Sequence, residues 1–192
     1  MKKITIKKKV HYSLRLLFGV GIFALFLIFI SCNDNKKEDQ GETDTKDVIS
    51  VQENNNTVAA YVTFIQADTN KMSLDHAFTN EALLKLTSAT GAMADEIDYR
   101  VKGDLDKAKE YAGKIVNDPF ETSHADDIKK AADILTNVLQ NMQQAKYPTL
   151  SNEITELKTA SAAINPETLT LDQRDAVKSF FAKAADLLQK MN

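Results

Sequence analysis

Residues 123–146 read SHADDIKKAADILTNVLQNMQQAK and contain neither glycine nor proline. Apolar residues recur in this stretch at alternating intervals of three and four, at Ile128, Ala131, Leu135, Val138, Met142 and Ala145. Those intervals are typical of an α-helix with one continuous apolar stripe along its length. The stretch therefore predicts a long amphipathic helix from about Ser123 to Lys146, and with it an all-α fold.

The same spacing recurs over most of residues 57–192. Four further stripes lie within residues 83–97, 105–115, 150–164 and 177–191, and Pro119, Pro148 and Pro166 all fall between stripes. A proline inside a helix costs about 3 kcal/mol, so these positions suit joints. Because short joints make successive helices antiparallel, we predict an up-and-down bundle of four to six helices. Residues 57–67 are left open between helix and strand, since Val62-Thr-Phe-Ile65 is β-prone.

The segment ahead of the bundle has a different composition. Residues 33–56 are rich in Asn, Asp, Glu, Lys and Thr, and Val48, Ile49 and Val51 are their only strongly apolar residues. Such a segment cannot bury enough apolar surface to offset its ordering entropy. We therefore predict that residues 32–56 form a disordered acidic linker that tethers the bundle.

Cys32, the single cysteine, follows a fifteen-residue apolar run from Leu16 to Ile30 and the small residue Ser31. Six basic residues precede the cysteine, and no acidic residue does. A basic flank, an apolar run of about 7–15 residues and a small-residue cut site are typical of a secretory signal. A membrane-spanning helix, the alternative as an uncleaved anchor, needs about 20 apolar residues.

Phe29-Ile30-Ser31-Cys32 resembles the lipobox of bacterial lipoproteins. This resemblance implies that residues 1–31 are a signal peptide and that Cys32, the new N-terminus, receives a covalent lipid with acyl chains such as palmitate. The charged residues 33–39 are similar to segments that help to sort some lipoproteins to the outer membrane or cell surface. We therefore expect a membrane-anchored protein of the cell envelope, in the outer membrane and facing the periplasm or the cell surface; a plain solvated linker is the alternative for residues 33–39.

Net charge narrows the choice of partners. The chain has 24 Lys and Arg against 27 Asp and Glu, and removal of six basic residues with the leader leaves 18 against 27, a net charge of −9. A surface of that sign repels nucleic-acid phosphates and anionic lipid headgroups. We expect no nucleic-acid partner, attachment to the membrane through the lipid on Cys32 alone, and another envelope protein or a peptide as the binding partner.

Few residues in the sequence are candidates for catalysis or for metal binding. The sequence has no phosphate-binding loop and no Gly-x-Ser-x-Gly, so we predict a non-catalytic binding or scaffolding domain without a resident cofactor. A divalent metal ion is the alternative, with His76, His124 and Glu121 as candidate ligands, because imidazole and carboxylate suit Zn²⁺ or Cu²⁺. Glu121 and His124 also have the Glu-x-x-His spacing of di-iron bundles, which use that motif twice.

One short motif lies near the C-terminus. Leu169-Thr170-Leu171-Asp172-Gln173 resembles the Leu-Thr-x-x-Gln motif of the Spy and CpxP family of small all-helical periplasmic proteins. The resemblance implies a periplasmic metal-binding or chaperone-like stress protein, which is the alternative to the scaffolding role. Thr170 and Gln173 also have the spacing of a helix capping box, which explains the same residues without kinship.

Overall fold

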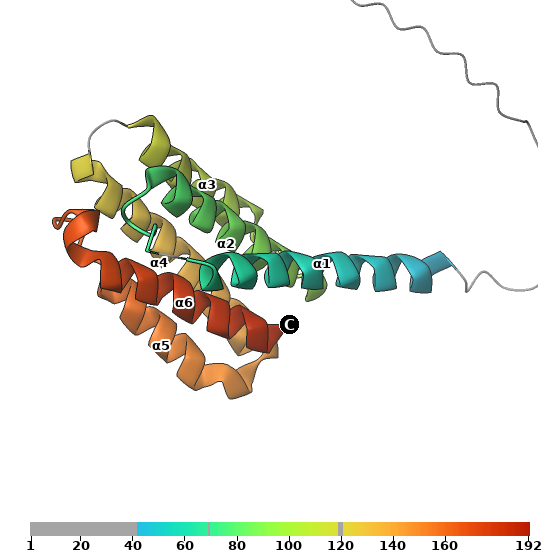
Figure 1. Cartoon of the computed structure of the whole chain (residues 1–192). Helices are drawn as coiled ribbons and strands as arrows, with labels where there is room; N and C mark the ends of the chain where they lie inside the picture. Colours follow the sequence, from blue (N-terminus) through green and yellow to red (C-terminus); the bar gives the residue numbers. More distant parts are fainter. Residues whose placement is uncertain (1–41, 69, 119–120) are drawn as a thin grey trace, which may run out of the picture. The chain divides into compact units, whose positions relative to one another are not determined.

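The computed structural model describes residues 42–68, 70–118 and 121–192, and it describes side chains from Ser50 onward except at 69 and 119–122. Over these residues the chain forms six α-helices and no strand, which confirms the predicted all-α bundle. The elements in chain order are α1 (Glu42–Gln66), α2 (His76–Glu96), α3 (Lys102–Asn117), α4 (Glu121–Lys146), the 3₁₀ turn η1 (Pro148–Leu150), α5 (Ser151–Ala162), the 3₁₀ turn η2 (Thr170–Gln173) and α6 (Arg174–Met191) (Figure 1).

Helices that are adjacent in the chain pack against each other, as short joints require. These contacts join α1 to α2, α2 to α3, α3 to α4, α4 to α5 and α5 to α6. The last helix also returns to the first part of the fold, since α6 packs against α1 and α2 (Figure 1). One hydrogen bond fixes this closure: the buried Tyr61 hydroxyl on α1 donates to the Phe181 carbonyl on α6 at 2.8 Å.

The apolar stripes form the core. On α4 the stripe residues from Ile128 to Met142 are buried, and only Ala145, in the last turn, is exposed. On α6 the five stripe residues are all buried: Val177, Phe180, Ala184, Leu187 and Met191. The remaining helices contribute Leu83, Leu86 and Met93 from α2, Ala108, Ala112 and Ile115 from α3, and Ile154 and Leu157 from α5. Helical periodicity therefore identified the buried faces correctly.

The start of the bundle differs from the prediction. Residues 57–66 are helical, which settles the choice between helix and strand, and α1 begins at Glu42 rather than near Thr57. Residues 42–56, expected in the disordered linker, are therefore part of a helix. Val58, Tyr61 and Val62 are buried in the bundle and hold the helix in place. Extending a helix that already exists adds one hydrogen bond per residue, whereas starting a new one is costly. With no glycine or proline between 42 and 56, the helix continues into this polar segment.

Candidate functional site

His76 and His124 meet where the N-terminal ends of α2 and α4 lie together. Asp75 caps α2, and its carboxylate accepts hydrogen bonds from the Ala77 and Phe78 amides at 2.9 and 3.2 Å. His76 is therefore the first residue of α2, while His124 lies in the first turn of α4. The two ring centroids are 4.3 Å apart, and the ring planes cross at 81°. Two candidate ligands that are far apart in the sequence are thus in direct contact.

The two nitrogens of His124 have different surroundings. Its ring is fully buried, and Nε2 lies 2.9 Å from the carbonyl oxygen of Asp118. A carbonyl only accepts hydrogen bonds, so Nε2 carries a proton and donates it. Nδ1 is buried and has no hydrogen-bond partner among the described residues. A neutral His124 therefore keeps an unused lone pair on Nδ1, whereas His76 is only half-buried.

The other candidate ligands contribute less. Glu121 begins α4, but its side chain lies outside the described residues. Within the described side chains, no group of three or more His, Cys, Asp and Glu residues is spaced to hold a metal ion. Asp127 lies one helical turn beyond His124 and is buried; burial raises the pKa of its carboxyl group, while Lys114 and His124 act against this rise. The candidate ligands whose side chains are described are therefore the imidazoles of His76 and His124, and the carboxyl group of Asp127 lies near His124.

A second feature is a groove between α1 and α2. It has a volume of about 490 Å³ and is lined by Asn56, Thr57, Ala60, Tyr61, Glu81, Leu84, Lys85 and Ser88. Leu84 is 37% exposed although it is a large apolar residue, and Val51 is 40% exposed on the part of α1 that precedes the groove. The groove thus combines exposed apolar surface with polar residues at its edges, as protein-binding grooves do.

Aromatic packing joins α1 to α2 next to Lys85, one of the residues that line the groove. The rings of Phe64 on α1 and Phe78 on α2 stack with centroids 4.5 Å apart, and the Lys85 ammonium lies 5.2 Å from the Phe64 centroid. Lys85 also pairs with Glu81 at 3.4 Å. These contacts hold α1 and α2 in a fixed relation and leave the groove with little net charge.

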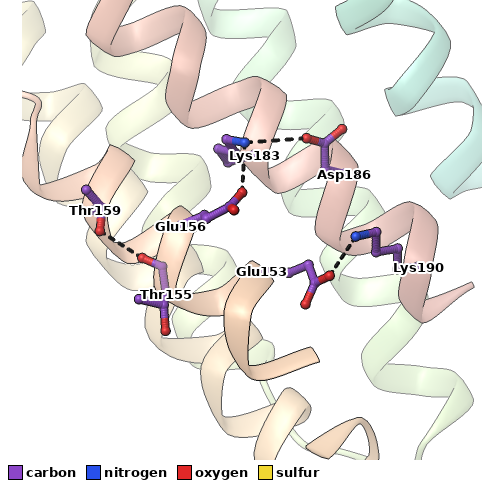
Figure 2. A network of polar contacts seen from close by, with 7 residues as sticks. All are labelled: Glu153, Thr155, Glu156, Thr159, Lys183, Asp186 and Lys190. Carbon is purple, nitrogen blue, oxygen red and sulfur yellow. Dashed lines mark hydrogen bonds and ion pairs between the residues drawn. The ribbon is translucent and has the colours of Figure 1, made fainter. Parts of the chain in front are cut away.

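The α5–α6 surface carries a network of ion pairs (Figure 2). Lys183 contacts Glu156 at 2.8 Å, and Lys190 contacts Glu153 at 2.6 Å. The hydrogen bond from Lys190 lowers the pKa of Glu153, and the hydrogen bond to Glu156 raises the pKa of Lys183. Because each charge already has a partner within the network, this surface links α5 to α6 and offers no free ligand group.

The Leu-Thr-x-x-Gln segment has a local structural role. Thr170 to Gln173 form η2, and Thr170 is buried there, while the capping box stays a prediction. The Gln173 amide nitrogen donates to the carbonyls of Asn165 and Thr168, and its oxygen accepts from the Asn165 backbone amide. The Gln173 side chain thus braces the loop between α5 and α6.

Sequence reasoning missed the groove and the Asp118 carbonyl. Leu84 follows a stripe residue and gives no periodic signal of its own, and a backbone carbonyl has no signature in the sequence.

Cys32 and the expected signal peptide lie outside the described residues. Among the residues that are described, no helix is both long and apolar enough to cross a bilayer. Comparison with protein-family models, curated proteins and solved structures gives no match.

Proposed function

We propose that the chain is a cell-envelope lipoprotein whose helical bundle is a non-catalytic module that binds another envelope protein or a peptide. The observation that carries this proposal is the position of the only cysteine, directly after an apolar run and Ser31 and ahead of a polar segment. A lone thiol at this position serves no intramolecular disulfide. Acylation gives it a function, since two or more acyl chains anchor a protein stably.

The length of the connection supports a bundle held close to the bilayer. Nine residues, 33–41, separate Cys32 from the start of α1 at Glu42. Nine residues span at most roughly 30 Å. Because α1 begins at Glu42, the chain between the anchor and the first helix is shorter than a linker ending at residue 56 would be, which limits the distance between the bundle and the bilayer.

The groove between α1 and α2 is the surface that we assign to the partner. Leu84 supplies exposed apolar area, and Lys85 and Glu81 give a polar edge. An amphipathic helix binds such a groove by placing its apolar face inside. The groove also adjoins the exposed part of α1, so a partner helix would contact both. The chaperone-like role implied by the Leu-Thr-x-x-Gln motif stays a prediction.

Metabolic labelling tests the anchor. Cells that express the full chain are fed an alkyne-bearing fatty acid, and the purified protein is probed for the label. We expect label on the parent chain and none on Cys32→Ser, together with a mass that shows loss of residues 1–31. Label that persists on Cys32→Ser, or a leader that stays attached, would contradict the proposal.

Site-specific photo-crosslinking in intact envelopes tests the groove separately. A photoreactive residue at Leu84 should give a discrete crosslinked species, and one at Val116, which is 47% exposed on α3, is the matched control. Leu84→Glu, combined with the probe at Ser88, should abolish the species because a charge in the groove opposes burial of an apolar face. Equal crosslinking from Leu84 and Val116 would remove the groove from the proposal and leave the anchor unaffected.

A further inference from the structure

We infer that His76 and His124 form a two-histidine site for a divalent transition-metal ion that accepts ligands at right angles, such as Cu²⁺ or Ni²⁺. The two side chains come from different helices and meet at the joined N-terminal ends of α2 and α4. This site is separate from the α1–α2 groove and does not depend on acylation of Cys32. It therefore adds a ligand to the protein beyond the partner proposed above.

The geometry of the rings favours cis ligation at 90°. With a metal–nitrogen bond of about 2.0 Å, each imidazole centroid lies roughly 3.1 Å from the ion, so two ligands at a right angle have centroids about 4.4 Å apart. The centroids of His76 and His124 are 4.3 Å apart. If both rings are perpendicular to the plane that contains the ion and the two ligand nitrogens, the ring planes cross at about 90°. The planes of His76 and His124 cross at 81°. A tetrahedral ion would hold the centroids roughly 5 Å apart.

The hydrogen bonding of His124 leaves one ring nitrogen able to bind a metal ion. Its Nε2 proton is held by the Asp118 carbonyl at 2.9 Å, which leaves the Nδ1 lone pair free. Histidine ligands usually donate their other ring N–H to a carbonyl or carboxylate, which fixes the ring and its tautomer. A buried acceptor without a partner costs free energy, and an ion bound at Nδ1 would satisfy it. The half-buried His76 gives the site access to solvent.

The surroundings provide compensating charge. Two helix N-termini carry partial positive charge, which opposes a cation. Asp75 caps α2, Asp127 lies in the second turn of α4, and Asp118, at the end of α3, accepts a hydrogen bond from Ser123 in the first turn of α4 at 2.6 Å. These three carboxylates offset that charge. Among the described side chains, no third His, Cys, Asp or Glu is grouped with this pair, so the two imidazoles are the ligands that these side chains supply.

Metal titration of the full chain in detergent, with Cu²⁺ and Ni²⁺ as the probes, tests this inference. We expect one bound ion per chain, and nitrogen hyperfine coupling in the Cu²⁺ electron paramagnetic resonance spectrum should report two imidazoles. His76→Gln and His124→Gln should each weaken Ni²⁺ binding by at least about tenfold and leave one imidazole in the spectrum. Asp172→Asn, which removes an exposed carboxylate on η2, is the matched control and should change neither result.

The His76→Gln variant separates loss of a metal ligand from loss of the fold. His76 is only half-buried, so this variant should retain the helical circular dichroism of the parent, even if His124→Gln loses stability. If folded His76→Gln still shows two imidazoles, or if the parent binds no ion through imidazole, the two rings make a packing contact only and the inference is wrong. Neither result affects the fatty-acid labelling of Cys32, so the two proposals fail independently.

Discussion

At the residue scale, Tyr61 joins the two ends of the bundle. Its ring is fully buried, and its hydroxyl on α1 donates to the Phe181 carbonyl on α6. Tyr61→Phe keeps the ring and removes this one hydrogen bond, so it should lower the free energy of unfolding by about 0.5–1.5 kcal/mol. Urea denaturation followed by circular dichroism at pH 7 measures the difference. Tyr111→Phe, at a half-buried ring on α3, is the matched control and should change stability by less than about 0.5 kcal/mol.

The same side chain predicts a pH dependence. Burial, and secondarily the charge of Asp186, raises the pKa of the Tyr61 phenol well above its usual value of 10. The unfolded chain therefore ionises this group first, and its contribution to stability is fully present below about pH 10 and is lost as pH rises further. Between pH 9 and 11 the parent should lose stability more steeply than Tyr61→Phe. Parallel slopes for the two proteins would show that the phenol ionises equally well in the folded state.

Asp68 organises the joint between α1 and α2. Its carboxylate is 6% exposed, accepts hydrogen bonds from the Lys71 and Met72 amides at 2.8 and 3.3 Å, and pairs with Lys178 of α6 at 3.4 Å. Asp68→Ala should cost about 1–3 kcal/mol, because it leaves the part-buried Met72 amide without its acceptor and removes the ion pair. Lys178→Ala removes the ion pair and the hydrogen bond from Lys178 to the Asn70 side chain at 3.2 Å, and thermal unfolding should show a smaller loss for it. Equal losses for both variants would assign the whole effect to the contacts of Lys178.

At the element scale, Gly91 sets the approach of α2 to α3. A Cβ atom at Gly91 would lie 3.1 Å from the Leu105 Cδ1 atom, which is closer than ordinary van der Waals contact. Leu105 is partly exposed, so its side chain can shift by the small distance needed. Gly91→Ala should therefore gain less than the roughly 1 kcal/mol that alanine adds to a helix interior, and Gly91→Val should destabilise the bundle.

The matched variant is Gly113→Ala on α3. A Cβ atom at Gly113 meets its nearest neighbour, the Asn117 side chain, only at 3.9 Å. This variant should gain nearly the full roughly 1 kcal/mol, which thermal unfolding would detect. If Gly91→Ala were as stabilising as Gly113→Ala, the α2–α3 contact would have more room than the 3.1 Å separation indicates.

The helices could be predicted because the spacing of apolar residues within each one follows the helical period. Ile128 to Met142 and the stripe of α6 repeat at helical intervals, and those intervals identify the buried face without any knowledge of neighbours. The meeting of His76 and His124 could not be predicted, because it depends on which helix ends come together in three dimensions. The early start of α1 was missed for a related reason: composition describes residues 42–56 in isolation, whereas their helix grows from the docked residues that follow.

At the scale of the whole molecule, α1 has two parts with different support. Residues from Ser50 to Glu53 are exposed, whereas Val58, Tyr61 and Val62 are buried in the bundle. The exposed part buries little apolar surface, and short isolated helices are marginal in water. Local stability should therefore fall steeply along α1 from residue 66 toward residue 50, and amide hydrogen exchange should show the same gradient.

Proline substitution distinguishes these two parts. Glu53→Pro and Thr63→Pro both replace exposed side chains on α1, so each acts through the backbone alone. Thr63→Pro breaks the helix where it packs against α2 and α6, and it should cost at least about 3 kcal/mol. Glu53→Pro should cost less than about 1 kcal/mol, because the helix can restart at the proline with its packed residues unchanged. Thermal unfolding of the two variants gives the comparison. Equal costs would mean that the polar half of α1 is packed in solution, either by a partner or by a second copy of the chain.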